Sequence, residues 1–311
     1  MKGIVLQTTG SWYAVQCEDG QVVECRLPGK FKLEELKTTN PIAVGDRVNV
    51  NTDADSRDKI IDEIFPRHNY IVRQSPRQKH HKHIIAANID QALLIATISQ
   101  PRTSTGFIDR FLIAAESYHI PVTILINKSD LLKEKELQKL EELKAVYEPL
   151  GYKVITASAE KKDGLDAVKA MLQDKATLVA GHSGVGKSTL VNALQPNLNI
   201  KTQRLSTKWQ KGMHTTTYAT MYRLYDSTYI IDTPGIKEFF VIEIQPEELS
   251  GYFPEMRARI QECEYNNCLH FNEPGCAVKA AVENGEIAYS RFENYLNILN
   301  DIQSVKHWER L

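Results

Sequence analysis

The sequence lacks any apolar run close to the roughly 20 residues that a membrane-spanning helix requires. Its opening segment, MKGIVLQTTGSWYAV, has neither the long apolar core nor the small-residue cleavage site of a secretory signal. The formal net charge is −1, so attraction of the whole molecule to nucleic acid is not indicated. Hydrophobic residues make up 42% and charged residues 25%, which is ordinary for a globular chain. We therefore expect a cytoplasmic protein that does not bind membranes.

Cysteine is scarce, and three of the five cysteines fall in one short window. The pattern Cys263-x4-Cys268-x-His270-x5-Cys276 offers three thiolates and an imidazole, a closed tetrahedral set typical of one structural Zn²⁺. Free buried thiols are the alternative interpretation. Because four protein ligands leave no open position, we expect the metal to hold together a segment too poor in apolar residues to fold alone, and not to catalyse a reaction.

The other two cysteines lie near a predicted hairpin. If Asp19 and Gly20 form a two-residue turn, Cys17 lies opposite Val22, and Cys25 lies opposite Ala14, three positions further from the turn. This register places the two thiols on opposite faces of the ribbon, so they are not expected to bridge.

Changes of pattern divide the chain into three predicted domains. Residues 1–68 read as five short strands with Gly, Asp and Pro between them, typical of an all-β barrel such as the OB fold, which serves either RNA binding or protein docking. Residues 69–240 alternate buried strands with amphipathic helices, which predicts an α/β doubly wound parallel sheet. Residues 241–311 lack strand patterns and read as short helices around the cysteine window, a small zinc domain.

Charge is unevenly distributed. No acidic residue occurs from Ile64 to Ile89 or from Lys175 to Tyr225, although both tracts contain several lysines and arginines. The first tract, RHNYIVRQSPRQKHHKH, connects the predicted barrel to the next domain. It either follows RNA phosphates or is a solvated linker; in the first case the affinity for RNA falls steeply with salt.

The stretch GHSGVGKST at 181–189 follows the predicted strand ATLVA and precedes the predicted helix STLVNALQ, the context of a phosphate-binding P-loop. Its glycines let backbone amides and a helix N-terminus point at phosphates. Lys187 is expected to reach the β- and γ-phosphates, and Ser188 to ligate Mg²⁺. The predicted nucleotide contacts of this loop are Gly181, His182, Ser183, Gly184, Val185, Gly186, Lys187, Ser188 and Thr189.

Two further loops predict recognition of guanine. In NKSD, Asp130 follows the buried strand PVTILI, and its carboxylate can accept from both guanine N1–H and the exocyclic amine, a donor pair that adenine lacks. Asn127 would brace this loop and approach the base, and the stem of Lys128 would cover the ring. After the next strand, the backbone amides of Ser158 and Ala159 can meet the guanine carbonyl.

The segments that would sense the γ-phosphate come last. In IIDTPG, Asp232 is expected in the Mg²⁺ shell and the Gly235 amide at the γ-phosphate. In GMHTTT, Thr216 is favoured over Thr215 and Thr217 as a further Mg²⁺ ligand, with a surface strand as the alternative for the threonine run. Base-reading loops thus precede the P-loop, which indicates a circular permutation and brings the switch end next to the C-terminal domain.

Catalysis cannot follow the common GTPase pattern. Ile236 stands after Asp-x-x-Gly, where many GTPases have a glutamine that orients water, so slow intrinsic turnover is expected. His214 in GMHTTT is the candidate catalytic group, and contact with RNA or capping of the loop is its alternative role.

The permuted order, together with the attached Cys/His window, resembles the RsgA family, also called YjeQ or YloQ, over essentially the full length. The resemblance implies an OB domain, a permuted GTPase domain and a zinc domain. It also implies GTP hydrolysis stimulated by the small ribosomal subunit late in its maturation, and it points to His214. The expected partners are GTP or GDP and the small subunit with its rRNA, bound by a monomer. A nucleotide-regulated RNA-binding scaffold is the alternative, whereas a small-molecule kinase would leave NKSD unexplained.

Overall fold

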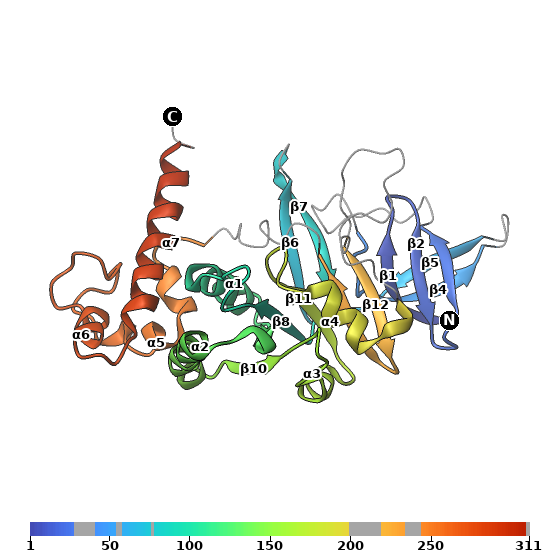
Figure 1. The fold of residues 1–311 in the computed structure, drawn as a ribbon. Coiled ribbons are helices and arrows are strands. Elements are labelled where there is room, and N and C mark those ends of the chain that lie inside the picture. Colours follow the sequence, from blue (N-terminus) through green and yellow to red (C-terminus); the bar gives the residue numbers. More distant parts are fainter. Residues whose placement is uncertain (28–40, 54–57, 76–77, 199–218, 234–243, 309–311) are drawn as a thin grey trace.

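The computed structural model describes residues 1–27, 41–53, 58–75, 78–198, 219–233 and 244–308. Figure 1 shows β1–β5 at one end of the molecule, helices α5–α7 at the other, and the α/β sheet with its helices between them. None of the helices in these ranges combines the length and the apolar character needed to cross a bilayer.

The N-terminal strands form the predicted five-stranded, OB-like barrel. Strand β1 pairs with both β2 and β4, and β3 pairs with β5, which closes the sheet on itself. Alternating apolar residues fill the interior, with Val5, Val15 and Ile61 fully buried. The strands are β1 (Lys2–Thr8), β2 (Tyr13–Cys17), β3 (Val22–Arg26), β4 (Arg47–Thr52) and β5 (Lys59–Ile64).

The predicted register of the β2–β3 hairpin is wrong by one residue. Cys25 lies opposite Tyr13, because the Cys17 amide bonds to the Gln21 carbonyl across a three-residue turn with Gly20 at φ 82°. Tyr13 and Cys17 lie on the same strand face, so both thiols share one face of the hairpin and are buried. Both are free cysteines, and burial raises the pKa of Cys25 to about 11, which makes it a poor nucleophile at neutral pH.

The central sheet has the strand order β10-β9-β8-β11-β13-β12, with β12 antiparallel to its neighbour and the others parallel. Every residue of β8, β9 and β11 is buried, because helices cover both faces. The strands are β8 (Gln91–Ala96), β9 (Val122–Asn127), β10 (Lys153–Ala157), β11 (Ala176–Ala180), β12 (Thr220–Tyr225) and β13 (Thr228–Asp232).

Two helices pack on each face of this sheet, as predicted for a doubly wound fold. Helices α1 (Thr105–Ser117) and α2 (Glu134–Tyr147) share one hydrophobic cluster with the strands, and α3 (Leu165–Leu172) and α4 (Lys187–Leu194) share the other. The chain runs from β8 to β9 and β10 on one side, and β11 then returns to the other side of β8. The loops after β8 and β11 therefore diverge at the topological switch point, where folds of this type bind ligands.

The basic tract forms part of a two-stranded antiparallel ribbon, β6 (Tyr70–Ser75) and β7 (Gln78–Ala87). The barrel also contacts the central sheet directly, since Gln7 of β1 pairs with Thr220 of β12. Part of the tract is therefore paired backbone, and the barrel meets the central sheet through the β1–β12 pairing as well as through the chain that follows β5.

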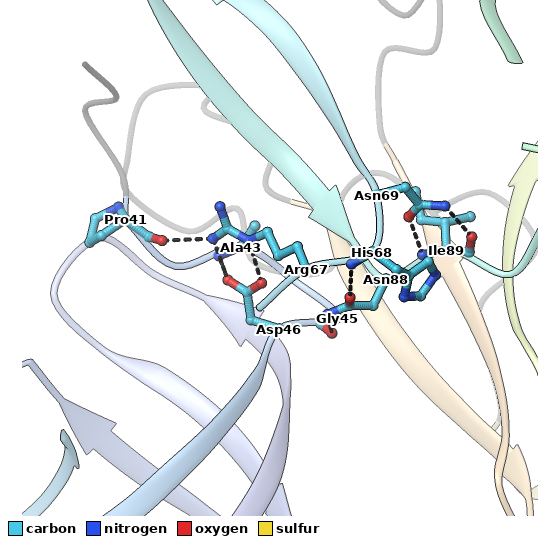
Figure 2. Close-up of polar contacts among 9 residues, drawn as sticks. All are labelled: Pro41, Ala43, Gly45, Asp46, Arg67, His68, Asn69, Asn88 and Ile89. Carbon is cyan, nitrogen blue, oxygen red and sulfur yellow. Dashed lines mark hydrogen bonds and ion pairs between the residues drawn. The ribbon is translucent and has the colours of Figure 1, made fainter. Parts of the chain in front are cut away.

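Figure 2 shows the polar junction at the base of this ribbon. Arg67 donates from Nε and Nη2 to the fully buried Asp46 carboxylate at 2.6 Å each. Asn88 donates to the Gly45 carbonyl at 3.0 Å and accepts from the His68 amide at 3.1 Å. Side chains thus pair the buried backbone groups where the barrel meets the following domain.

The C-terminal residues are helical, but the expectation of only short helices is wrong. Helix α7 (Tyr289–Trp308) has 20 residues and packs along α1. Its apolar residues recur at helical spacing and share a cluster with Leu249, Phe253 and Met256, which stabilises one long helix. The other described elements here are η5 (Leu249–Tyr252), α5 (Pro254–Arg257), η6 (Ile260–Glu262) and α6 (Ala277–Glu283).

Candidate nucleotide site and metal centre

The segment 181–186 connects β11 to α4 by a turn that only glycine can make at two positions. Gly181 has φ 147° and Gly186 has φ 98°; a Cβ at Gly181 would overlap the Ile95 carbonyl, and one at Gly186 would overlap the Asn127 amide. Lys187, at the start of α4, donates from Nζ to the carbonyls of Gly181 and His182 at 2.7 and 2.8 Å. With these carbonyls held by the lysine, the loop amides at the helix N-terminus suit an anion.

Asn127 ties three predicted loops together. Its Nδ2 donates to the Val185 carbonyl of the P-loop at 2.7 Å, and its Oδ1 accepts from the Ala159 amide at 3.1 Å. The side chain is only 2% exposed. Segments separated by 58 and 32 residues thus meet at one buried amide, which brings the predicted base-reading loops next to the predicted phosphate loop.

The acidic residue of NKSD is held by the serine of the following loop. Ser158 donates from Oγ to Asp130 at 2.5 Å and accepts from the Lys161 amide at 3.0 Å. Lys128, in a left-handed conformation with φ 62°, extends its Nζ to the Gln100 carbonyl at 2.6 Å. Ser158 therefore orients the Asp130 carboxylate, and the aliphatic stem of Lys128 extends from its own loop to the loop after β8.

Asp232 ends β13 and is 6% exposed. Burial raises its pKa to about 7, and the cation of Lys187 opposes that rise. Burial also lowers the pKa of Lys187, and the negative charge of Asp232 opposes that lowering. A divalent cation and phosphates bound here would favour the charged forms of both groups, because each would gain a counter-charge.

Four further predicted residues border these contacts. Ser188 and Thr189 lie in the first turn of α4, and Ser183 and Gly184 are exposed at the rim of the loop. His214, Thr216, Gly235 and Ile236 lie outside the described residues.

The loop 97–104 also borders the site and was not predicted from the sequence. Its Gln100 carbonyl accepts from Lys128 Nζ. Its Pro101 lies beside Gly184 of the P-loop, because a Cβ added at Gly184 would lie 3.5 Å from the proline ring. Helix α1 follows, and its Phe107 ring lies 3.6 Å from the His182 ring, centroid to centroid. The loop's place in the fold could have predicted its role, because the loop follows β8, and β8 is the neighbour of β11, the strand that precedes the P-loop.

The four predicted zinc ligands form one cluster. The ligand atoms of Cys263, Cys268, His270 and Cys276 all lie within 4.8 Å of one another. His270 Nδ1 is 3.3 Å from Cys276 Sγ and 3.7 Å from Cys263 Sγ. Tetrahedral bonds to zinc of about 2.0 Å from nitrogen and 2.3 Å from sulfur separate these atoms by about 3.6 Å, so the residues fit one ion.

The backbone around the cluster is shaped for these ligands. His270 takes a left-handed conformation with φ 58°, and Glu273 accepts from the amides of Leu269, Phe271 and Asn272 between 2.8 and 3.0 Å. Burial raises the pKa of the Cys268 thiol to about 12, so a bound cation is needed to hold it as a thiolate.

Family models match most of the chain. A model described as the RsgA GTPase matches residues 64–242, and one described as the RsgA N-terminal domain matches residues 2–60.

Curated relatives are similar over their full lengths. "Small ribosomal subunit biogenesis GTPase RsgA 2" of Bacteroides thetaiotaomicron is 47% identical over 99% of both chains. The protein named "Small ribosomal subunit biogenesis GTPase RsgA" in Cytophaga hutchinsonii is 52% identical over 96% of this chain and 98% of its own.

Two solved structures share the fold. YjeQ from Thermotoga maritima matches with a TM-score of 0.78 and 36% identity over 97% of this chain and 98% of its own. YloQ, described as a circularly permuted GTPase, matches with a TM-score of 0.74 and 29% identity over 97% and 95%.

Proposed function

Because this chain belongs to the RsgA family of GTPases, we propose that it hydrolyses GTP during biogenesis of the small ribosomal subunit. The observation that carries the proposal is the buried Asn127 amide, which joins the P-loop to both base-reading loops. A phosphate loop and a guanine-reading loop held in this way suit one GTP molecule.

In this proposal each loop has a separate task. The amides of 181–189 and Lys187 would bind the phosphates, and Ser188, Thr216 of the switch segment and Asp232 would hold Mg²⁺. Asp130 reads the base, Lys128 covers it, and the amides of 158–159 approach its carbonyl. Bound Mg²⁺ would neutralise charge that develops on the phosphates. Asn127, only 2% exposed, holds the loops that carry these groups in position relative to one another.

Catalysis in the proposal depends on a residue other than the one after Asp-x-x-Gly. Ile236 cannot orient water, so His214 is assigned that role, and the Gly235 amide is assigned to the γ-phosphate. The small subunit completes the site and stimulates hydrolysis late in its own maturation, as the RsgA resemblance implies.

The remaining proposals concern organisation. We assign the barrel to 1–68, the permuted GTPase domain to 69–240 and the zinc domain to 241–311. The Cys/His cluster fits Zn²⁺ through its donor set and spacing. We also propose a cytoplasmic monomer that contacts rRNA.

Small subunits are expected to raise the GTP turnover of this protein by about 100-fold or more, since a partner that completes a GTPase site can supply that much. The measurement is phosphate release from GTP with and without purified small subunits. Lys187→Ala serves as the inactive control. A turnover unchanged by saturating small subunits would contradict the proposal.

A further inference from the structure

Helix α1 contacts the P-loop on one side. The Phe107 ring, in the first turn of α1, lies 3.6 Å from the His182 ring and is 8% exposed. His182 is also the residue whose carbonyl accepts from Lys187 Nζ at 2.8 Å. Phe107 therefore supports the part of the backbone that holds the phosphate-binding lysine.

The same turn of α1 is held from the other side by α7. Asp109 is fully buried and accepts from Arg291 Nη1 at 2.6 Å, from Asn294 Nδ2 at 2.6 Å and from Tyr147 Oη at 2.7 Å. Burial raises the pKa of Asp109, and the Arg291 cation and these three hydrogen bonds oppose that rise because they favour the ionised carboxylate. A Cβ at Gly106 would lie 3.2 Å from Asn294 Oδ1, so α7 approaches the α1 backbone closely.

Arg291 is fixed by a second carboxylate. Its Nε and Nη2 donate to the two oxygens of Glu255 at 2.7 and 3.1 Å, and its guanidinium lies 4.6 Å from the centre of the Phe253 ring. The side chain is 1% exposed. This buried, bidentate arrangement fixes the orientation of the guanidinium, because the loss of either carboxylate partner would leave a buried charge unpaired.

We propose that Arg291 is a positioning residue for the P-loop, acting through Asp109 and Phe107 near the start of α1. This inference rests on the proposed function of the P-loop as the GTP site. Two residues of helix rotate by about 200°, so Phe107 and Asp109 face opposite ways from one rigid turn. A shift of His182 on nucleotide binding moves that turn against α7. By thermodynamic linkage, if nucleotide binding displaces α7, a change that displaces α7 alters nucleotide affinity.

The coupling is tested by GDP affinity in the full-length protein. Arg291→Lys keeps a cation but loses the planar fork that spans Asp109 and Glu255. It is expected to weaken GDP binding about fivefold. Phe107→Leu removes the contact between the Phe107 and His182 rings. In that background Arg291→Lys is expected to weaken GDP binding by less than about twofold, because the contact that would transmit its effect is already absent.

Ile113→Ala is the matched control. Ile113 lies one turn further along α1, is 3% exposed and packs in the same C-terminal cluster as Tyr295. Its truncation is expected to lower the melting temperature and leave GDP affinity unchanged. If Arg291→Lys does not fold, Asn294→Ala removes another donor from Asp109 and is expected to weaken GDP binding in its place.

A second readout follows α7 itself. GDP is expected to increase amide-exchange protection at 289–299 in the wild-type chain and to have no such effect in Phe107→Leu. Equal losses of affinity in Ile113→Ala and Arg291→Lys, or effects of Arg291→Lys and Phe107→Leu that simply add, overturn the coupling. A wild-type chain that binds no GDP contradicts the proposed function itself, which keeps the two failures distinct.

Discussion

Replacing Asp130 with Asn is expected to weaken GDP binding by at least about 100-fold and to let the protein bind XDP. The carboxylate would accept two hydrogen bonds from guanine, and hydrogen bonds to a charged group contribute about 1.5–3 kcal/mol each. An amide presents a donor to the base instead, which suits the carbonyl of xanthine and leaves one guanine donor unpaired. Calorimetric titration of GDP, XDP and ADP against both proteins measures the switch.

Asp163→Asn is the control for this substitution. Asp163 is exposed in the neighbouring loop, and its backbone pairs with Ser158. The same change of charge there is expected to leave all three affinities unchanged. Asp130→Asn protein that retained wild-type affinity for GDP would show that another group reads the base.

Replacing Cys268 with Ser is expected to lower the zinc content from one ion per chain to nearly none and to unfold the C-terminal residues. Cys268 and Cys276 belong to the hydrophobic cluster of that region, which includes Phe253 and Tyr295, so the ligands and the core form together. Structural zinc binding supplies about 10–16 kcal/mol in small zinc domains. Elemental analysis and amide exchange over 249–299 measure the two effects.

Cys17→Ala is the matched control, since Cys17 is a buried free thiol in the barrel, far along the chain from the cluster. It is expected to keep one zinc ion per chain and the protection of 249–299. Wild-type protein freed of metal by a chelator, with that protection intact, would contradict a structural role for the ion.

Local sequence signals predicted loops and ligands that the structure brings close together. The P-loop was predictable because its spacing, its glycines and its flanking strand and helix all act within about ten residues. Asp130 and Ser158 were predictable as partners in one site because the carboxyl ends of neighbouring parallel strands meet at one edge. The metal cluster was predictable because its ligands lie close together in the chain.

Contacts across long separations left no such signal. Asp109 and Arg291 look like ordinary charged positions on two amphipathic helices, and their 182-residue separation hides the pair. The length of α7 depended on packing against α1, which a single sequence does not display. The hairpin register at Cys17 failed for a local reason, because a three-residue turn and a two-residue turn share the same Asp-Gly signature.

The proposed site requires one guanine nucleotide to be held by separated loops, and amide exchange with and without GDP tests this most directly. Residues 127–130, 158–161 and 181–189 are expected to gain protection together at one GDP concentration, and ADP is expected to protect none of them at that concentration. Protection confined to 181–189, or equal protection by ADP, would contradict a single site that joins base and phosphate recognition.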